Sequence, residues 1–339
     1  MTARTVAPES APIAPLSFVT RSMGGRLAIH LDAGSGGAAA TTAAADIADA
    51  GTAAAAELAG AGRESRRAAA RIETWAARLT RHEDASDLSR LNADPGELVA
   101  VRPTLAAALA AGREAMLLAP GYVDIALLDA RLAAETGRPA PPAAAQPATA
   151  EWSLARTRHG SALVRRAAGV RFDLGGVGKG WIADRALQLL HDFPSAIVDA
   201  DGDMAVRSAP GRVWEIAIDD PRVEDGELAT LRIGGARGRT WGVATSGTSV
   251  HRWSDGPQPR HHLIDPRTGR PAVTDVVQAT VVADSALRSE ACAKAAVIAG
   301  SVRGFALLDC APIRGAVLLL EDGRVLALPK TLALLAEAA

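Results

Sequence analysis

The chain has 339 residues, a hydrophobic fraction of 48%, a charged fraction of 22% and a formal net charge of −1. This length allows one large domain or roughly two of about 100–200 residues, and in either case a sizeable hydrophobic core. The near-neutral charge argues against a nucleic-acid-binding protein, and two cysteines are too few for a disulfide framework or a cysteine zinc cluster.

The N-terminus carries no targeting motif. Residues 1–15 are rich in Pro and Ala, and we expect them to form a disordered arm ahead of a folded domain over 16–339. They contain no apolar stretch of signal-peptide length and no cysteine for a lipid anchor. No run of 18 apolar residues occurs in the chain. We therefore expect a cytoplasmic protein with no membrane span.

The first half of the expected domain predicts two strands followed by helices. Residues 16–32 predict a pair of strands, and the Ala-rich segment 36–79 predicts a long helix, because alanine is the best helix former. A polar segment over 80–96 precedes a second helix over 102–118, which begins with a proline. Residues 137–150 are again rich in Pro and Ala and predict an internal linker or loop.

The second half is dominated by short strands. Helices are predicted over 180–191 and 286–300, and polar loops over 241–252 and 261–269. Strands are predicted over 152–172, 196–206, 213–219, 228–233 and 276–283, with a hairpin over 315–328. Hairpin-joined strands with grouped helices favour an α+β fold, in which helices pack against mixed or antiparallel sheets.

The densest group of functional residues runs from Asp173 to Gly180. A strand ends at Asp173, four glycines and Lys179 follow, and a helix begins near Gly180. Glycines allow a close backbone approach, and a helix N-terminus offers free N–H groups, so this geometry suits an anion. Lys179 is one of only three lysines among the 37 basic residues. A tight strand-to-helix turn with a surface lysine fits the same residues, and the P-loop pattern is absent.

Two further groups carry candidate chemistry. Thr245-Ser246-Gly247 supplies hydroxyl groups, and His262 precedes the turn Asp265–Gly269, where it can act as a general base or cap the turn. A triad of Ser246, His262 and Asp265 lacks the Gly-x-Ser-x-Gly elbow and is not favoured. Elsewhere, Asp199, Asp201 and Asp203 alternate as on one face of a strand. They predict either a metal site or a strand that runs into an acidic turn.

Taken together, these motifs resemble one family, the FAD:protein FMN transferases, also known as ApbE-like flavin transferases. The motifs that carry the resemblance, in the order of the family, are Met23-Gly24, Ser86–Asn92, Gly121–Asp124, Asp173–Gly180 with Asp184, Gly202-Asp203, Thr245–Gly247 and His262–Gly269. The resemblance implies an ApbE-like α+β fold and binding of FAD. It also implies Mg²⁺-assisted transfer of FMN from FAD to a Thr or Ser hydroxyl of a target flavoprotein, with release of AMP.

The resemblance also assigns roles to residues. His262 is implied as the catalytic base, and the backbone carbonyl of Gly178 as a ligand of Mg²⁺. The residues implied to line the FAD site are Met23, Asn92, Asp124, Asp173, Lys179 and Thr245. Four departures from the family pattern lie outside the metal site. Gly25 replaces a usual Thr, His82 replaces a usual aromatic residue, Ile125-Ala126 replaces a usual Pro-Thr, and Asp201 replaces the first of two usual glycines.

The largest departure concerns the metal. The resemblance implies an Asp and, four residues later, a Thr as Mg²⁺ ligands on one helix, but this chain has Glu290 and Lys294. An i, i+4 spacing keeps both side chains on one helix face. Glutamate can bind Mg²⁺, whereas a protonated lysine cannot. We hypothesise that the Lys294 ammonium meets the FAD pyrophosphate and replaces part of the metal's role.

Three alternatives stay open beside what the resemblance implies. Lys294 can instead form a simple salt bridge with Glu290 in a paralogue that has lost activity. A non-catalytic FAD-binding or flavin-delivery protein would use the same pocket without chemistry. An FAD pyrophosphatase would release FMN and AMP into water.

Overall fold

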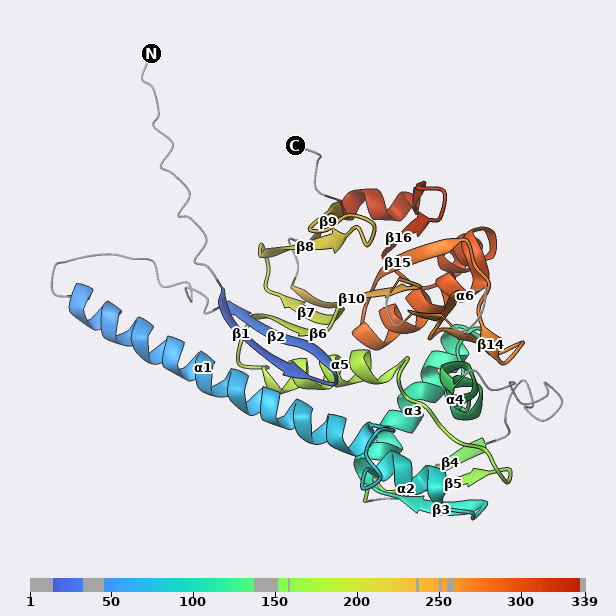
Figure 1. Ribbon diagram of the computed structural model, residues 1–339. Coiled ribbons are helices and arrows are strands. Elements are labelled where there is room, and N and C mark those ends of the chain that lie inside the picture. Colours follow the sequence, from blue (N-terminus) through green and yellow to red (C-terminus); the bar gives the residue numbers. More distant parts are fainter. Residues whose placement is uncertain are drawn as a thin grey trace.

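The computed structural model describes residues 15–32, 46–136, 152–157, 159–235, 238–249, 252–254 and 259–335. The predicted linker over 137–150, and all but the last residue of the predicted arm over 1–15, lie outside these ranges. An eight-stranded sheet in the order β1-β2-β6-β7-β10-β15-β16-β17 forms the centre (Figure 1). Neighbouring strands in it are antiparallel throughout. Its strands are β1 (Leu16–Ser22), β2 (Gly25–Asp32), β6 (Ser195–Ala200), β7 (Asp203–Ser208), β10 (Arg239–Gly247), β15 (Val276–Ala283), β16 (Gly315–Leu320) and β17 (Val325–Ala327).

Helices and smaller sheets surround this sheet, which confirms the predicted α+β class. The helices are α1 (Asp46–Leu79), α2 (Asp87–Ala93), α3 (Pro103–Leu118), α4 (Leu128–Thr136), α5 (Gly178–Leu189), α6 (Ala286–Cys310) and the 3-10 helix η1 (Pro329–Leu334). The smaller sheets pair β3 (Leu98–Val101) and β4 (Trp152–Arg156) with β5 (Ala162–Arg166), β8 (Val213–Asp219) with β9 (Glu227–Gly234), β11 (Arg252–Ser254) with β12 (Pro259–His261), and β13 (Ile264–Asp265) with β14 (Arg270–Pro271).

Both faces of the central sheet are covered, which explains why β6 and β16 are buried along their whole length. Helices α5 and α6 pack on one face. The β8–β9 hairpin packs on the other face, where Trp214, Ile216 and Ile233 meet sheet residues such as Val206 and Val243. Each Å² of apolar surface removed from water stabilises the folded state by about 25 cal/mol. Burial on both faces therefore holds the sheet between its covering layers.

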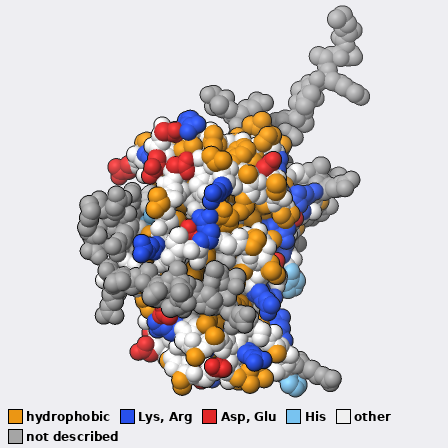
Figure 2. Space-filling view, turned by 90° about the vertical axis from the view of Figure 1, so that its right-hand side faces the viewer, with side chains coloured by type: hydrophobic (Ala, Val, Ile, Leu, Met, Phe, Trp, Pro, Cys, Tyr) orange, Lys and Arg blue, Asp and Glu red, His pale blue; other side chains and the backbone are white. Residues whose placement is uncertain are grey.

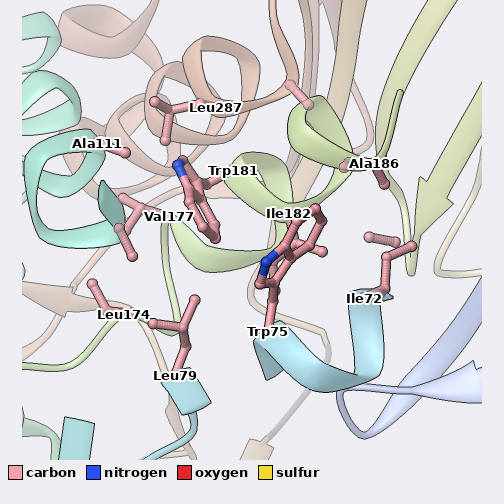
Figure 3. Packing of buried hydrophobic residues seen from close by; sticks show 14 of the residues in the cluster. Ile72, Trp75, Leu79, Ala111, Leu174, Val177, Trp181, Ile182, Ala186 and Leu287 are labelled. Carbon is pink, nitrogen blue, oxygen red and sulfur yellow. The ribbon is translucent and has the colours of Figure 1, made fainter. Parts of the chain in front are cut away.

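Trp181 lies at the centre of the helical core, directly after the glycine loop. Figure 3 shows it between α1, α3, α5 and α6, near Leu287 and Val177. Its ring meets that of Trp75 from α1 edge to face, with centroids 6.0 Å apart, a favoured arrangement for aromatic pairs. Ile72 and Leu79 line the same face of α1, which matches its amphipathic spacing. The start of α5 is therefore anchored in the core.

The N-termini of α5 and α6 cap each other. The Gly180 N–H of α5 donates to the Glu290 carboxylate of α6 at 2.9 Å. In return, the Asp184 carboxylate of α5 accepts from the Ala286 and Leu287 N–H groups at 2.9 and 3.0 Å. Each carboxylate satisfies backbone donors that a helix terminus leaves unpaired. A Cβ at Gly180 would lie 2.8 Å from the backbone of Ala286, so only glycine allows this close approach.

Several sequence predictions are confirmed. The strand pair over 16–32 is β1 and β2, the helix over 102–118 is α3, and the hairpin over 315–328 is β16 and β17. The described part of the long N-terminal helix, α1, begins at Asp46. The helix predicted to end at Gly300 does break there, at φ +78°, before a second helical segment continues to Cys310.

Two predictions are wrong. Residues 241–252 were expected to form a polar loop, but β10 runs through Gly247 and pairs with both β7 and β15. The sequence of this segment is typical of a loop because glycine and small residues stand where β10 packs closely against the start of α6. A Cβ at Gly242 would lie 2.0 Å from the Ser285 carbonyl oxygen. The strand predicted over 196–206 is two strands, because a turn at Asp201-Gly202 divides it.

Helix α6 is the one described helix that is long and apolar enough to cross a membrane by length and composition. Half of its most apolar window is buried inside the protein. It is interrupted at Gly300 and packs against β10 and β15. These features are typical of the core helix of a globular domain.

The Asp184 cap predicts a pH-dependent contribution to stability. Burial raises the pKa of Asp184 to about 6, although its two N–H bonds lower the pKa and so act against that rise. Between about pH 4 and pH 6 the folded state holds a proton that the unfolded chain has released, so this group's contribution to the unfolding free energy falls as pH rises.

We expect the difference in unfolding free energy between wild type and Asp184→Asn to decrease by about 1–3 kcal/mol from pH 4 to pH 6. Urea denaturation measured over this range checks it. Asp192→Asn, at an exposed position, controls for the loss of one negative charge. A difference that does not change with pH for Asp184→Asn would contradict the assignment.

Candidate active site

Asn92 fixes the segment that leads into the glycine loop. Its Oδ1 accepts from the Phe172 N–H at 2.7 Å, and its Nδ2 donates to the Phe172 carbonyl at 2.8 Å. One residue later, the Asp173 N–H donates to the Ile125 carbonyl at 2.7 Å. The Asp173 side chain turns the chain by accepting from the Gly175 N–H at 2.8 Å. Of the residues predicted to bind FAD, Asn92 and Asp173 thus shape the loop.

Four charged groups gather at the start of α5. Lys179 forms an ion pair with Asp203 at 2.9 Å and donates to the Asp201 carbonyl at 3.3 Å. Burial alone would lower the pKa of Lys179, but the attraction of Asp203 and Glu290 outweighs it and raises the pKa. Burial raises the pKa of Glu290 to about 8, and the nearby Asp203 adds to the rise.

Lys294, the fourth of these groups, reaches from α6 to the glycine loop. A Cβ at Gly176 would lie 1.1 Å from the Lys294 Nζ, so the ammonium occupies the space that a side chain there would need. Burial lowers the pKa of Lys294, and the negative charges of Glu290 and Asp173 oppose that effect. The two loop lysines therefore come from different helices and meet at one loop.

A second group of charges flanks the loop, and no motif in the sequence indicates it. Arg81 and Arg131 both bind the Glu135 carboxylate, at 2.5 and 2.7 Å. Burial alone would raise the pKa of Glu135, but these two guanidinium groups lower it. Arg81 also lies 3.8 Å from Asp173, and Arg131 donates to the carbonyl of His262. In an arginine-rich chain, helical arginines carry no distinguishing pattern, so only the structure identifies them.

The two adjacent histidines differ in their roles. The His261 ring is buried, with Nε2 2.9 Å from the Ala272 carbonyl and Nδ1 accepting from the Leu263 N–H at 3.2 Å. Both ring nitrogens of His261 thus support the local fold. His262 is only partly buried, and its carbonyl ties it to Arg131. The resemblance assigns proton transfer to His262, and this assignment stays a prediction.

The turn after His262 does not form the alternative triad. The Asp265 carboxylate binds Arg267 through two bonds of 2.9 and 2.8 Å and also accepts from the Arg267 N–H. It is therefore engaged in building the turn over 266–269. The Arg267 guanidinium in turn lies over the Tyr122 ring, 4.7 Å from its centroid.

Asp124 adjoins the loop, whereas Thr245 lies in the central sheet. Thr245 follows Ala244, which pairs with Asp203 in the sheet, and its hydroxyl lies 2.8 Å from that of Thr280. Asp124 precedes the residue that receives the Asp173 N–H bond. Its carboxylate accepts from the Ala126 N–H at 2.8 Å, and burial raises its pKa. Because side chains alternate along a strand, Thr245 and Thr280 share the sheet face of Val243 and Val282, which packs under the β8–β9 hairpin. Of these two predicted FAD-site residues, the structure thus brings Asp124 to the loop and does not bring the Thr245 side chain there.

Met23 belongs to a hairpin turn beside a second, similar turn. Met23-Gly24 and Asp201-Gly202 each join two antiparallel strands with positive φ at both residues, the geometry favoured for two-residue hairpins. The two turns touch, because the Arg26 N–H donates to the Asp201 carboxylate at 3.2 Å. A Cβ at Gly25 would lie 2.3 Å from Asp201 Cγ. The departures at positions 25 and 201 are therefore one coupled exchange.

The three alternating aspartates do not share one strand face, so that prediction is wrong, and the alternative of an acidic turn is confirmed. Asp201 lies in the turn with φ +60°, because the strand ends at Ala200. Asp199 accepts from the Gly202 N–H and pairs with Arg26 at 2.8 Å. Asp203 pairs with Lys179 instead.

The residues present do not fit the Mg²⁺ site that the resemblance implies. Over the described ranges, no group of three His, Cys, Asp or Glu side chains is placed to hold a metal ion. Glu290 is committed to the Gly180 N–H. Lys294 occupies the position of a usual ligand, and its ammonium lies at the loop where the Gly178 carbonyl was expected to contribute. A protonated amine offers no lone pair and repels a cation.

Comparison with known proteins points to one family. A sequence model of the ApbE family matches residues 40–318. A curated relative from Treponema pallidum, named FAD:protein FMN transferase, is 34% identical over 170 residues, which cover 47% of this chain and 46% of the relative. Another of the same name, from Salmonella typhimurium, is 34% identical over 122 residues, covering 35% and 34%. The matched segments thus span less than half of these relatives.

Solved structures share the fold. The apo flavinyl transferase ApbE of Pseudomonas stutzeri superposes with a TM-score of 0.72 at 19% identity, covering 96% of this chain and 98% of that one. The ApbE protein of Thermotoga maritima gives a TM-score of 0.72 at 20% identity, covering 95% and 100%. At these identities the likeness establishes the fold, as an ApbE-like α+β arrangement over nearly the whole chain.

The coupled exchange at positions 25 and 201 predicts non-additive stability effects. In Gly25→Thr the new side chain must displace the Asp201 carboxylate, whereas Asp201→Gly clears that space and keeps the turn. We expect Gly25→Thr to be more favourable in the Asp201→Gly background than in wild type by about 0.5–3 kcal/mol. Urea denaturation of the four proteins of this cycle measures the coupling.

Val19→Thr, at a half-exposed position of the same hairpin, is the matched control and should combine additively with Asp201→Gly. Additivity of Gly25→Thr and Asp201→Gly within about 0.3 kcal/mol would rule out the exchange.

Proposed function

The chain belongs to the ApbE family, and from that premise we propose that it is an FAD:protein FMN transferase. The single observation that carries the proposal is the glycine loop at the N-terminus of α5, where the Lys294 ammonium lies against Gly176 and Lys179, paired with Asp203, begins the helix. A diphosphate is the part of FAD that such a loop is suited to hold. The names of the curated relatives support the same activity.

The reaction joins FMN to a hydroxyl of an acceptor flavoprotein. The oxygen of an acceptor Thr or Ser forms a bond to the phosphorus on the FMN side of the diphosphate. The bond from that phosphorus to the bridging oxygen breaks, and AMP leaves with the bonding electron pair. The hydroxyl proton passes to a base. Phosphoryl transfer of this kind depends on positioning and on stabilising negative charge rather than on covalent participation of the protein.

The chain's residues divide these tasks. The glycine loop binds the diphosphate, while Asn92 and Asp173 keep the loop in shape. We assign proton transfer to His262, because His261 uses both of its ring nitrogens to support the fold. Arg131 positions His262 through its carbonyl. Asp124 lies beside the loop, and the family resemblance is the basis on which Met23, Asp124 and Thr245 are assigned to the remainder of the FAD site.

The surroundings of the reaction are part of the proposal. We place the enzyme in the cytoplasm, with a flavoprotein as acceptor. A nucleic acid is not favoured as a partner, because the net charge is only −1 and basic and acidic side chains are interspersed over the described part of the face in Figure 2. The alternatives of a flavin-binding protein and a pyrophosphatase are separated by the assay below.

The assay incubates the purified chain with FAD, with and without a flavoprotein acceptor that carries a Thr target. We expect AMP release that requires the acceptor, together with covalently flavinylated acceptor detected by mass spectrometry. FAD binding without AMP release would select the binding protein, and AMP release without acceptor would select the pyrophosphatase. Either result would overturn the transferase.

His262→Ala is expected to lower the transfer rate by about 10²–10⁴-fold while FAD binding is retained, since a general base contributes to that extent. The control is His191→Ala, which removes a largely exposed histidine at the end of α5. Equal transfer rates for His262→Ala and wild type would remove His262 from the mechanism.

A further inference from the structure

Within the described part of the chain, Lys294 differs from Lys179 in having no close carboxylate partner. Lys179 pairs with Asp203 at 2.9 Å. Among the residues that the structure describes, no carboxylate oxygen lies within 4.0 Å of the Lys294 ammonium, although Glu290 lies one helical turn before it. The alternative of a simple Glu290–Lys294 salt bridge is therefore not what the structure contains. The positive charge of the Lys294 ammonium is therefore available to an anion that binds at the loop.

The position of the Lys294 side chain shows where that charge acts. Its neighbours on α6, Ala293 and Ala295, are fully buried, whereas Lys294 keeps partial exposure. Its Nζ lies at Gly176, where the missing side chain leaves room for it. Gly175 and Gly176 are themselves exposed or partly exposed. The ammonium thus lies at the loop rather than in the apolar core.

The other charged side chains at the loop already form hydrogen bonds or ion pairs within the protein. The Glu290 carboxylate accepts from the Gly180 N–H at 2.9 Å and caps α5. Asp203 is paired with Lys179. On the far side, Arg81 and Arg131 are held by Glu135. Lys294 is therefore the cation next to the glycines that no described carboxylate pairs with at close range. An arriving diphosphate carries negative charge and would supply the missing partner.

From this arrangement we propose that Lys294 neutralises the diphosphate of FAD at the Gly175–Lys179 loop, so that the chain binds FAD without a divalent cation. The inference rests on the proposed function, because it concerns the same site. It replaces the expectation that Glu290 and the Gly178 carbonyl hold Mg²⁺. A metal ion at Glu290 would face both ammonium groups, whereas a fixed ammonium supplies positive charge with no need to recruit an ion.

The test measures FAD affinity by flavin fluorescence in excess EDTA and in excess Mg²⁺. Wild type is expected to bind FAD equally well in both. Lys294→Met keeps the length of the side chain and removes the charge, and it should weaken FAD binding by about tenfold or more, since a charge-assisted hydrogen bond is worth that much. Riboflavin, which has no phosphate, should bind both proteins equally.

Lys330→Met is the matched control. Lys330 donates to the Leu308, Asp309 and Ala311 carbonyls at the far end of α6, away from the loop. This variant should bind FAD as wild type does, which shows that loss of a lysine on its own has no effect. A thermal melt of each variant confirms that it is folded before its affinity is compared.

A second variant restores the ligand types that the resemblance implies. Glu290→Asp combined with Lys294→Thr removes the ammonium and supplies a shorter carboxylate and a hydroxyl on one helix face. We expect isothermal titration calorimetry to detect Mg²⁺ binding to this variant and not to wild type. FAD binding by the variant should then be stronger in Mg²⁺ than in EDTA.

The outcomes separate the two proposals. Wild type that binds FAD only with Mg²⁺, or Lys294→Met that binds FAD as tightly as wild type, would overturn the inference and leave the transferase in place. Wild type that binds FAD under neither condition would overturn both. Unchanged Mg²⁺ binding in the double variant would also count against the inference.

Discussion

The structure depends on the mutual capping of α5 and α6. Glu290 accepts the Gly180 N–H, and Asp184 accepts the Ala286 and Leu287 N–H groups. Because glycine at position 180 lets the two backbones nearly touch, the two helix N-termini are held side by side. Everything that converges on the glycine loop follows from this contact: Lys179 arrives from α5, and Lys294 arrives from α6. The loop itself is fixed from the other side by Asn92.

This contact also explains the chemistry available at the loop. A carboxylate that serves as a buried helix cap is a poor candidate for a metal ligand, and burial raises the pKa of Glu290 to about 8. Lys294, four residues later, brings an ammonium to the glycines on the same helix face. With lysine in place of a hydroxyl residue at position 294, the positive charge at the loop comes from the protein's own ammonium group instead of from a bound metal ion.

Much of the fold could be predicted from the sequence, because hydrophobic periodicity and turn residues report local structure directly. The strand pair around Met23-Gly24, helix α3 and the break at Gly300 illustrate this. Strand β10 could not be predicted, because Gly242 and Thr245 are selected by contacts with α6 and β15 that lie far away in the sequence. In the site, motif order indicated Asp173, Lys179 and Lys294. The Arg81–Glu135–Arg131 cluster and the contact between Gly25 and Asp201 exist only in three dimensions.

The most direct measurement of the central claim is a crystal structure of the FAD complex grown with Mn²⁺, with anomalous diffraction recorded to locate the metal. Mn²⁺ binds the oxygen ligands that suit Mg²⁺. The account predicts the Lys294 Nζ within hydrogen-bond distance of a diphosphate oxygen and no anomalous peak between Glu290 and the glycine loop. An anomalous peak there, with Lys294 turned away from the diphosphate, would contradict it.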